Sequence, residues 1–186
     1  MTGPPGGASV PAGQGSQPRA PGARPGASNQ ARDRDPAGRP RNARPRDGLG
    51  RPLPRGQAGE ERIPDDLAVP PYEAISLAQG LLDSGRPFHA HEVLEASWKA
   101  APPAERELWK GLAQIAVGLT HARRGNATGA AALLRRGGQR VGRYAGAAPH
   151  GIDAGTIARQ ASSLAYRIDT DGLAAAAGPG ADFRLT

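Results

Sequence analysis

Cysteine is absent from this chain of 186 residues, and aromatic side chains are few: two Phe, two Trp and three Tyr. Without cysteine, the chain forms no disulfide, offers no thiolate ligand to a metal and has no cysteine nucleophile. It also lacks an apolar run long enough for a signal peptide or a membrane-spanning helix. We therefore expect a cytoplasmic protein without a membrane partner.

The first 62 residues lack the side chains that a hydrophobic core requires. They contain 11 Pro and 12 Gly, and no Phe, Tyr, Trp or Ile occurs before Ile63. Such a segment cannot bury enough apolar surface to offset the entropy that is lost on ordering. It also carries 11 Arg against five acidic residues, and so holds most of the chain's net charge of +7. We expect residues 1–63 to be a disordered, basic tail.

An arginine-rich tail of this kind supports one functional hypothesis, the nonspecific and salt-sensitive binding of nucleic acid or of an acidic protein. No aromatic side chains are interleaved with the charges, so base stacking is not expected. A solvating extension without a partner fits the same composition, and the sequence leaves both interpretations open.

Residues 64–170 have the pattern of one small all-α domain. Strand signals are nearly absent, whereas apolar residues recur at helical spacing. This length can bury one modest core. The Gly-Pro-Gly sequence at 178–180 indicates that residues 171–186 are a flexible end. Five helices are expected, at residues 71–84, 87–100, 103–124 and 126–144, with a fifth that begins near Asp153.

The third predicted helix is expected to be central in the bundle. Apolar and small residues cover most of its circumference and leave one narrow, largely polar strip. Its small residues, Gly111 and Gly118 among them, would let a neighbouring helix approach closely. The residues of the strip are Lys110, Gln114, Val117 and His121.

Gly137 and Gly138 weaken the fourth predicted helix, because a glycine inside a helix costs about 1 kcal/mol relative to alanine. Asn126 is the expected N-cap of this helix, and Asp153 is the expected N-cap of the fifth. Since most of the connecting loops are short, neighbouring helices should be antiparallel.

The second predicted helix carries the most informative polar group, His91, Glu92 and Glu95. On a helical wheel, His91 and Glu95 fall on the apolar face and Glu92 falls at its rim. Burying an unpaired carboxylate is costly, so Glu95 should have a partner, be protonated or bind a ligand. The apolar residues of that face are Phe88, Leu94 and Trp98.

Two polar residues of the third helix are the expected partners of this group. Gln114 and His121 lie two turns apart on the polar strip, and we expect them to face His91 and Glu95. On the same wheel His89 falls on the opposite side of the second helix, where we expect it to be exposed to solvent.

Two runs of residues, GRPFHAHEVLEASW at 85–98 and KGLAQIAVGLTHARRGNATGA at 110–130, carry a family resemblance. They resemble the bacterial and archaeal family called domain of unknown function 309, over roughly residues 72–144. The resemblance implies an all-α fold and supports Asn126 as the start of the fourth helix. It implies no reaction.

Several functions fit the polar cluster of His91, Glu92, Glu95, Gln114 and His121. In the first hypothesis the cluster is a buried network that organises the core or a binding site, in a non-enzymatic module that could also form a homo-oligomer. In the second, His91, Glu92, Glu95 and His121 hold a divalent metal ion, as in a metal-dependent hydrolase. A third hypothesis is general acid–base catalysis without metal. The residues do not decide between an enzyme and a binding protein, and no other cofactor is indicated.

Overall fold

The structure is a computed structural model that describes residues 3, 44–64, 67–174 and 183–185. All of the described helices belong to the unit of residues 43–186. The disorder predicted for the start of the chain falls, for residues 1–2 and 4–43, outside the described residues.

The predicted all-α fold is confirmed. The α-helices are α1 (Pro71–Asp83), α2 (Pro87–Ala100), α3 (Arg106–Arg123), α4 (Ala127–Gly142) and α5 (Ala154–Asp171), and a short 3-10 helix, η1 (Pro149–Gly151), precedes α5. In the described ranges, the only β-type pairing is one isolated bridge between Arg46 and Pro52. None of the described helices is both long and apolar enough to cross a membrane.

The predicted N-caps of α4 and α5 are confirmed. The Gly129 N–H donates to Asn126 Oδ1 at 2.9 Å, and the Thr156 N–H donates to Asp153 Oδ1 at the same distance. Each bond satisfies an amide of the first turn that has no partner inside the helix.

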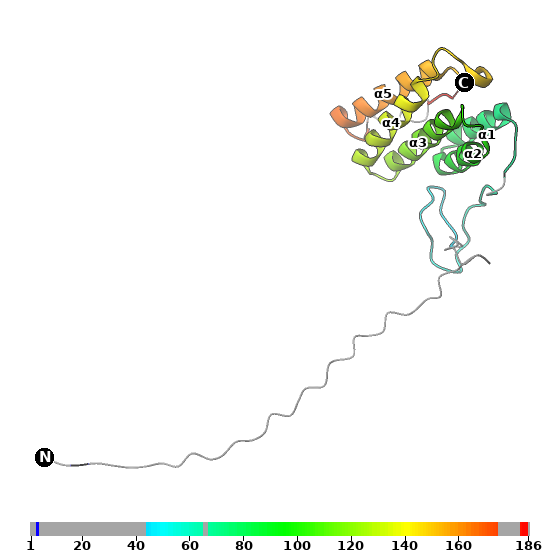
Figure 1. Cartoon of the computed structure of the whole chain (residues 1–186). Coiled ribbons are helices and arrows are strands. Elements are labelled where there is room, and N and C mark those ends of the chain that lie inside the picture. Colours follow the sequence, from blue (N-terminus) through cyan, green and yellow to red (C-terminus); the bar gives the residue numbers. More distant parts are fainter. Residues whose placement is uncertain (1–2, 4–43, 65–66, 175–182, 186) are drawn as a thin grey trace. The chain divides into compact units, whose positions relative to one another are not determined.

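Helix α3 is central, as its pattern predicted. Each helix packs against the next one along the chain, so that α1 and α2 lie on one side of α3 and α4 and α5 on the other (Figure 1). Most of its circumference is buried, and the predicted strip of four residues is half-buried. The largest buried side chains of α3 are Leu108, Trp109, Leu112 and Ile115.

Small residues let α3 and α4 approach each other so closely that their backbones come into contact. A Cβ added to Gly137 would lie 2.7 Å from the Gly111 carbonyl oxygen and 2.7 Å from Ile115 Cγ1. On the other side of α4, a Cβ on Gly138 would lie 3.1 Å from Ala161 Cβ of α5. Gly137 and Gly138 do not break α4, and the closeness of both neighbouring helices explains why glycine is present there.

Residues 44–63 correct the predicted tail, because this segment folds into a loop against the helical domain. The Asp47 carboxylate accepts the backbone N–H groups of Leu49 and Arg51, at 3.0 and 2.7 Å, and so closes a tight turn. Arg124, which directly follows α3, donates to the Leu49 carbonyl oxygen, at 2.8 Å from its Nε. The loop is held mainly by polar contacts, so its lack of large apolar residues does not prevent order.

The flexible end predicted for residues 171–186 is corrected for residues 183–185, while residues 175–182 and 186 lie outside the described residues. Phe183 and Leu185 are 2% and 1% exposed and belong to the hydrophobic core. The side chain of Gln79 from α1 and that of Gln160 from α5 hold the backbone of this segment. Gly178-Pro179-Gly180 gives this end the composition of a flexible segment, whereas Phe183 and Leu185 beyond it are apolar and enter the core.

The contact between α3 and α4 leads to a prediction about glycine. The substitution Gly137→Ala should lower the free energy of unfolding by about 1–3 kcal/mol, because the new methyl group overlaps the α3 backbone. The control Gly80→Ala, at an exposed position of α1 with open space around it, should raise it by up to about 1 kcal/mol. Urea unfolding measures both. Equal effects of the two changes would contradict the close approach of α3 and α4.

Candidate functional site

The buried face of α2 differs from the one that the wheel predicted. Ala90, Val93 and Leu94 are fully buried, whereas His91 and Glu95 lie half-buried at the edge of the helix's core face. The wheel gave most weight to large Phe88 and Trp98, but both are only partly buried on the flank. Small alanine and valine residues form the core face here because α1 and α3 pack closely against it.

Glu95 has partners on its own helix. His91 Nε2 lies 3.6 Å from Glu95 Oε2, and Lys99 Nζ lies 3.1 Å from Glu95 Oε1. The other carboxylate of the group is also paired, since Arg62 Nε lies 3.9 Å from Glu92 Oε1. The predicted need of Glu95 for a partner is therefore met along α2 by the charged Lys99, with the His91 ring beside the carboxylate.

Gln114 and His121 do not face His91 and Glu95, which corrects the predicted cluster. Gln114 Oε1 accepts a hydrogen bond from Arg140 Nε of α4 at 3.1 Å, and His121 Nδ1 lies 2.9 Å from Asn126 Nδ2. Both side chains thus lie toward α4 and its first turn. In the part of the chain that the structure describes, no group of three or more His, Cys, Asp or Glu residues is arranged to hold a metal ion. The predicted set of four ligands is not assembled.

His89 is buried rather than exposed, which corrects a second prediction. It is 2% exposed, and its Nε2 lies 3.6 Å from Glu60 Oε2 of the loop. The same carboxylate oxygen lies 2.8 Å from Arg86 Nη2, so Glu60 joins two residues at the start of α2. His89 Nδ1 and Arg86 Nε are buried without a hydrogen-bond partner in the described structure.

The loop, the turn between α1 and α2 and the end of α3 border an open cleft of about 600 Å³. Three arginines and two carboxylates supply its charges. The lining residues are Asp47, Gly48, Leu49, Arg51, Glu60, Ser84, Gly85, Arg86 and Arg123. The sequence could not indicate this cleft, because five of its nine lining residues come from the segment predicted to be a tail.

Two adjacent arginines at the end of α3 bind backbone carbonyl groups of the cleft region. Arg123 Nη1 donates to the Gly85 oxygen at 2.9 Å, and Arg124 donates to the Leu49 oxygen. The guanidinium groups of Arg46 and Arg124 each lie over the Phe88 ring, at 5.7 and 5.9 Å from its centroid. The first contact joins the loop to α2, and the second joins the end of α3 to α2.

The arginines of this region repel one another. Burial is the main cause that lowers the pKa of Arg124, and the neighbouring charges of Arg46 and Arg51 lower it further, while Asp47 raises it. Positive charge is therefore in local excess where the loop meets α3.

The helical part of the chain is similar to known proteins. Residues 75–133 match the family described as Domain of unknown function (DUF309). The match confirms the predicted resemblance. The uncharacterized protein YpuF of Bacillus subtilis (strain 168) is 48% identical over 48 residues, which cover 25% of this chain and 28% of that protein. No solved structure matches the chain.

The DUF309 match reaches from α1 into α4 and includes the cleft residues 84–86 and Arg123, but not the loop. One sequence signal could have located the loop. Asp47-Gly48 is a typical turn pair, and an aspartate can accept backbone N–H groups two or more residues ahead.

The lowered pKa values of three histidines predict how the stability of the fold depends on pH. Burial is the main cause that lowers the pKa of His89, His91 and His121, with repulsion from Arg86, Lys99 and Arg124 respectively. The unfolded chain therefore binds protons at a higher pH than the folded chain does, near the ordinary histidine pKa of about 6.5. Above that pH the histidines do not reduce the free energy of unfolding. Below it, the free energy of unfolding decreases as the pH falls through their lowered folded-state pKa values.

Urea unfolding at pH 7.5 and pH 5.5 tests this expectation. The free energy of unfolding should be smaller at pH 5.5, and the difference between the two values should shrink in His91→Gln. Stability that rises toward pH 5.5 would contradict the expectation, as would a His91→Gln variant with the full pH dependence of the parent chain.

Proposed function

We propose that the helical domain is a binding module for a small anionic ligand, which it holds in the cleft between the loop and the end of α3. The observation that carries the proposal is the lining itself: Arg51, Arg86 and Arg123 surround a space of about 600 Å³. Cavities of this size suit small molecules. Guanidinium groups bind phosphate and carboxylate groups through paired N–H donors.

The three lining arginines differ in how their charge is compensated. Arg51 pairs with Asp47 at 2.7 Å and Arg86 pairs with Glu60 at 2.8 Å. Arg123, in contrast, binds the Gly85 carbonyl group and contacts no carboxylate among the described residues. An arginine held by a neutral acceptor keeps its full charge for a ligand, so Arg123 is the proposed centre of recognition.

The lining supports binding better than catalysis. Its one hydroxyl, Ser84 Oγ, donates to the Leu81 carbonyl oxygen at 3.0 Å. The nearby His89 is buried against Glu60, and His91 is paired with Glu95. We assign these histidines to the packing and orientation of α2, which brings Arg86 to the cleft.

Titration calorimetry with pyrophosphate and with citrate, at physiological ionic strength, tests the proposal. At least one of the two probes should bind the full chain, and Arg123→Gln should weaken that binding about tenfold or more, because a charge-assisted hydrogen bond contributes about 1.5–3 kcal/mol. Its control is Arg143→Gln, which removes the same charge from an exposed position that follows α4, at the other end of α3.

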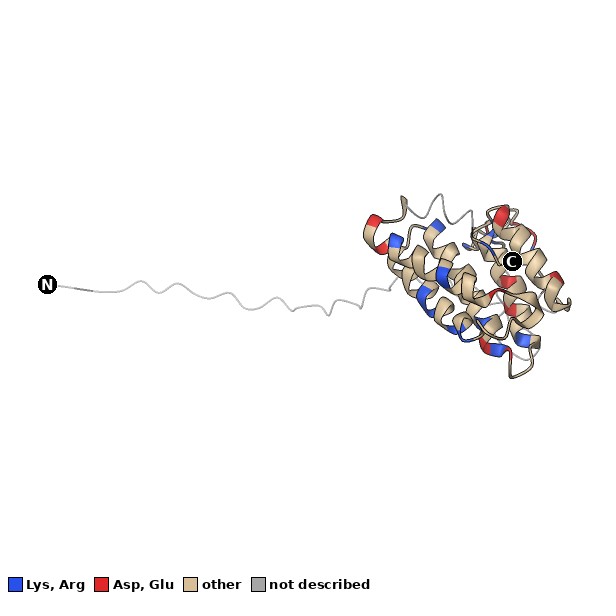
Figure 2. Cartoon of the chain, turned by 90° about the horizontal axis from the view of Figure 1, so that it is seen from above, with Lys and Arg blue, Asp and Glu red and all other residues tan. Residues whose placement is uncertain are grey.

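The control is needed because basic residues also lie along other helices of the domain (Figure 2). Nonspecific attraction would weaken equally in both variants and would fall steeply with added salt. Failure of both probes to bind, or equal losses in Arg123→Gln and Arg143→Gln, would contradict a specific site.

A further inference from the structure

Basic residues accumulate in the second half of the helical domain. Residues 108–152 contain seven Lys and Arg residues and no Asp or Glu. On α4, Arg135 forms an ion pair with Asp169 of α5. Arg140 of the same helix pairs with Glu107, which directly precedes the acid-free stretch. The acids of neighbouring segments therefore neutralise only part of the positive charge on α4.

Two further arginines, Arg136 and Arg143, lie on one side of α4. Both are exposed, and neither forms an ion pair in the described part of the chain. Arg143 directly follows α4 and keeps helical backbone angles, so the two positions are two turns, about 10 Å, apart along the helix axis. Gln139 is exposed between them on the same side. Positions so far apart cannot enclose one small anion, but they can contact separate phosphate groups of one strand.

A second exposed stripe runs along α5 and consists of Arg159, Ser162 and Tyr166. Intervals of three and four residues place these side chains on one side of the helix. Arg159 Nη2 donates to the Thr156 hydroxyl oxygen at 2.7 Å, and Arg159 forms no ion pair among the described residues. Tyr166 is 67% exposed, so most of its ring is open to solvent.

The two stripes lie next to each other because α4 and α5 are antiparallel and in close contact. A Cβ on Gly142 would lie 3.3 Å from Ala158 Cβ. A Cβ on Gly138, the residue before Gln139, would lie 3.7 Å from Ser162 Oγ. This register pairs three positions of α4 with three of α5: Arg143 with Arg159, Gln139 with Ser162, and Arg136 with Tyr166. We call the surface of these six residues the α4–α5 face.

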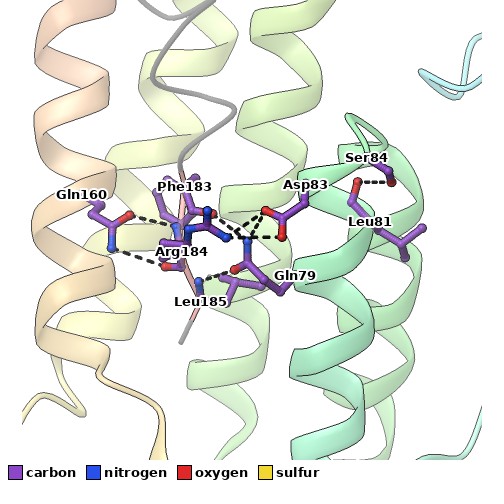
Figure 3. A network of polar contacts seen from close by, with 8 residues as sticks. All are labelled: Gln79, Leu81, Asp83, Ser84, Gln160, Phe183, Arg184 and Leu185. Atoms are coloured by element: carbon purple, nitrogen blue, oxygen red, sulfur yellow. Dashed lines mark hydrogen bonds and ion pairs between the residues drawn. The ribbon is translucent and has the colours of Figure 1, made fainter.

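The end of the chain covers a different side of α5. The Arg184 N–H donates to Gln160 Oε1 at 2.9 Å, and Gln160 Nε2 donates to the Arg184 carbonyl oxygen at 3.4 Å (Figure 3). Gln79 of α1 binds the backbone of residues 183–185 from the opposite side. These contacts leave the stripe that contains Tyr166 exposed.

We propose that the α4–α5 face binds single-stranded nucleic acid, with its arginines on backbone phosphate groups and the Tyr166 ring stacked on a base. Guanidinium groups bind phosphate through paired N–H donors, and an exposed aromatic ring is a platform for an unpaired base. The tyrosine favours this ligand over an acidic protein, which offers negative charge but no base. It also favours a single strand over a duplex, whose bases are already stacked on one another. The proposal does not depend on the anion cleft.

Fluorescence anisotropy with the full chain and a labelled oligothymidylate of about 15 nucleotides tests the role of the arginines. Arg136→Gln and Arg159→Gln should each weaken binding severalfold. Each should also reduce the slope of log Kd against log salt concentration by about 0.7, because one phosphate contact is lost. The control Lys99→Gln removes one charge from an exposed position of α2, on the other side of α3, and should leave the slope unchanged.

Two exposed tyrosines provide a matched test of base stacking. Tyr166→Ala should weaken binding about fivefold or more without changing the salt dependence, since a stacking contact is lost and no charge is removed. Tyr166→Phe keeps the ring and should bind like the parent chain. The control is Tyr72→Ala on α1, where the side chain is 65% exposed, and it should have no effect.

Photo-cross-linking locates the bound strand independently of affinity. An oligonucleotide that carries 5-iodouracil should modify Tyr166 and not Tyr72, as determined by mass spectrometry of the digested protein. Residues 1–62 contain no aromatic residue, so a cross-linked tyrosine cannot belong to the start of the chain. An oligouridylate of the same length distinguishes the two sources of the strand: tighter binding than oligothymidylate would assign the face to RNA, and weaker binding would assign it to DNA.

Three results would overturn the proposal. The first is that neither oligonucleotide binds at physiological ionic strength. The second is that the variants at Arg136, Arg159 and Tyr166 all bind as tightly as the parent chain, which would place the contact elsewhere. The third is that the arginine variants lose affinity while Tyr166→Ala and Tyr72→Ala bind equally, because the face would then attract any polyanion, an acidic peptide included.

Discussion

The close approach of α3 and α4 is the constraint on which the rest of the structure depends. Gly137 faces the α3 backbone and Gly138 faces α5, so both neighbouring helices approach the α4 backbone closely at these two positions. Larger side chains at these positions would separate α3 from the second half of the bundle. Because α3 is the central helix, its position also fixes where its last turn meets the turn between α1 and α2 and the loop of residues 44–63.

That last turn of α3 connects the core to the candidate site. Arg123 binds the carbonyl group of Gly85, whose φ of +73° suits glycine and whose missing side chain leaves room for the guanidinium group. Arg124 binds the loop instead. Two neighbouring residues thus tie separate segments to one helix end, and positive charge accumulates there as a consequence of holding the fold together. An anionic ligand would relieve the repulsion that this arrangement creates.

The fold could be predicted from the sequence because helical periodicity, caps and glycine positions are local signals. Asn126 and Asp153 cap their helices as expected, and the half-buried strip on α3 contains the four residues that its pattern indicated. The site could not be predicted in the same way. A helical wheel treats large apolar side chains as the core face, whereas in α2 the core is made by Ala90 and Val93, and Phe88 packs against a loop. His91 and Glu95 were therefore placed too deep, and His89 not deep enough.

The described parts of the two segments that composition assigned to disorder, residues 44–63 and 183–185, are held by side chains of the helical domain, which explains why composition failed for them. Residues 44–63 have few large apolar groups, yet Arg124 and Phe88 hold the loop through a carbonyl group and a guanidinium group. Residues 183–185 follow a Gly-Pro-rich stretch, yet two glutamines bind their backbone. In each case the order of the segment is determined by a receiving surface far away in sequence. A local sequence pattern can indicate that a segment lacks a hydrophobic core of its own. It cannot indicate whether a distant surface of the domain binds the segment and orders it.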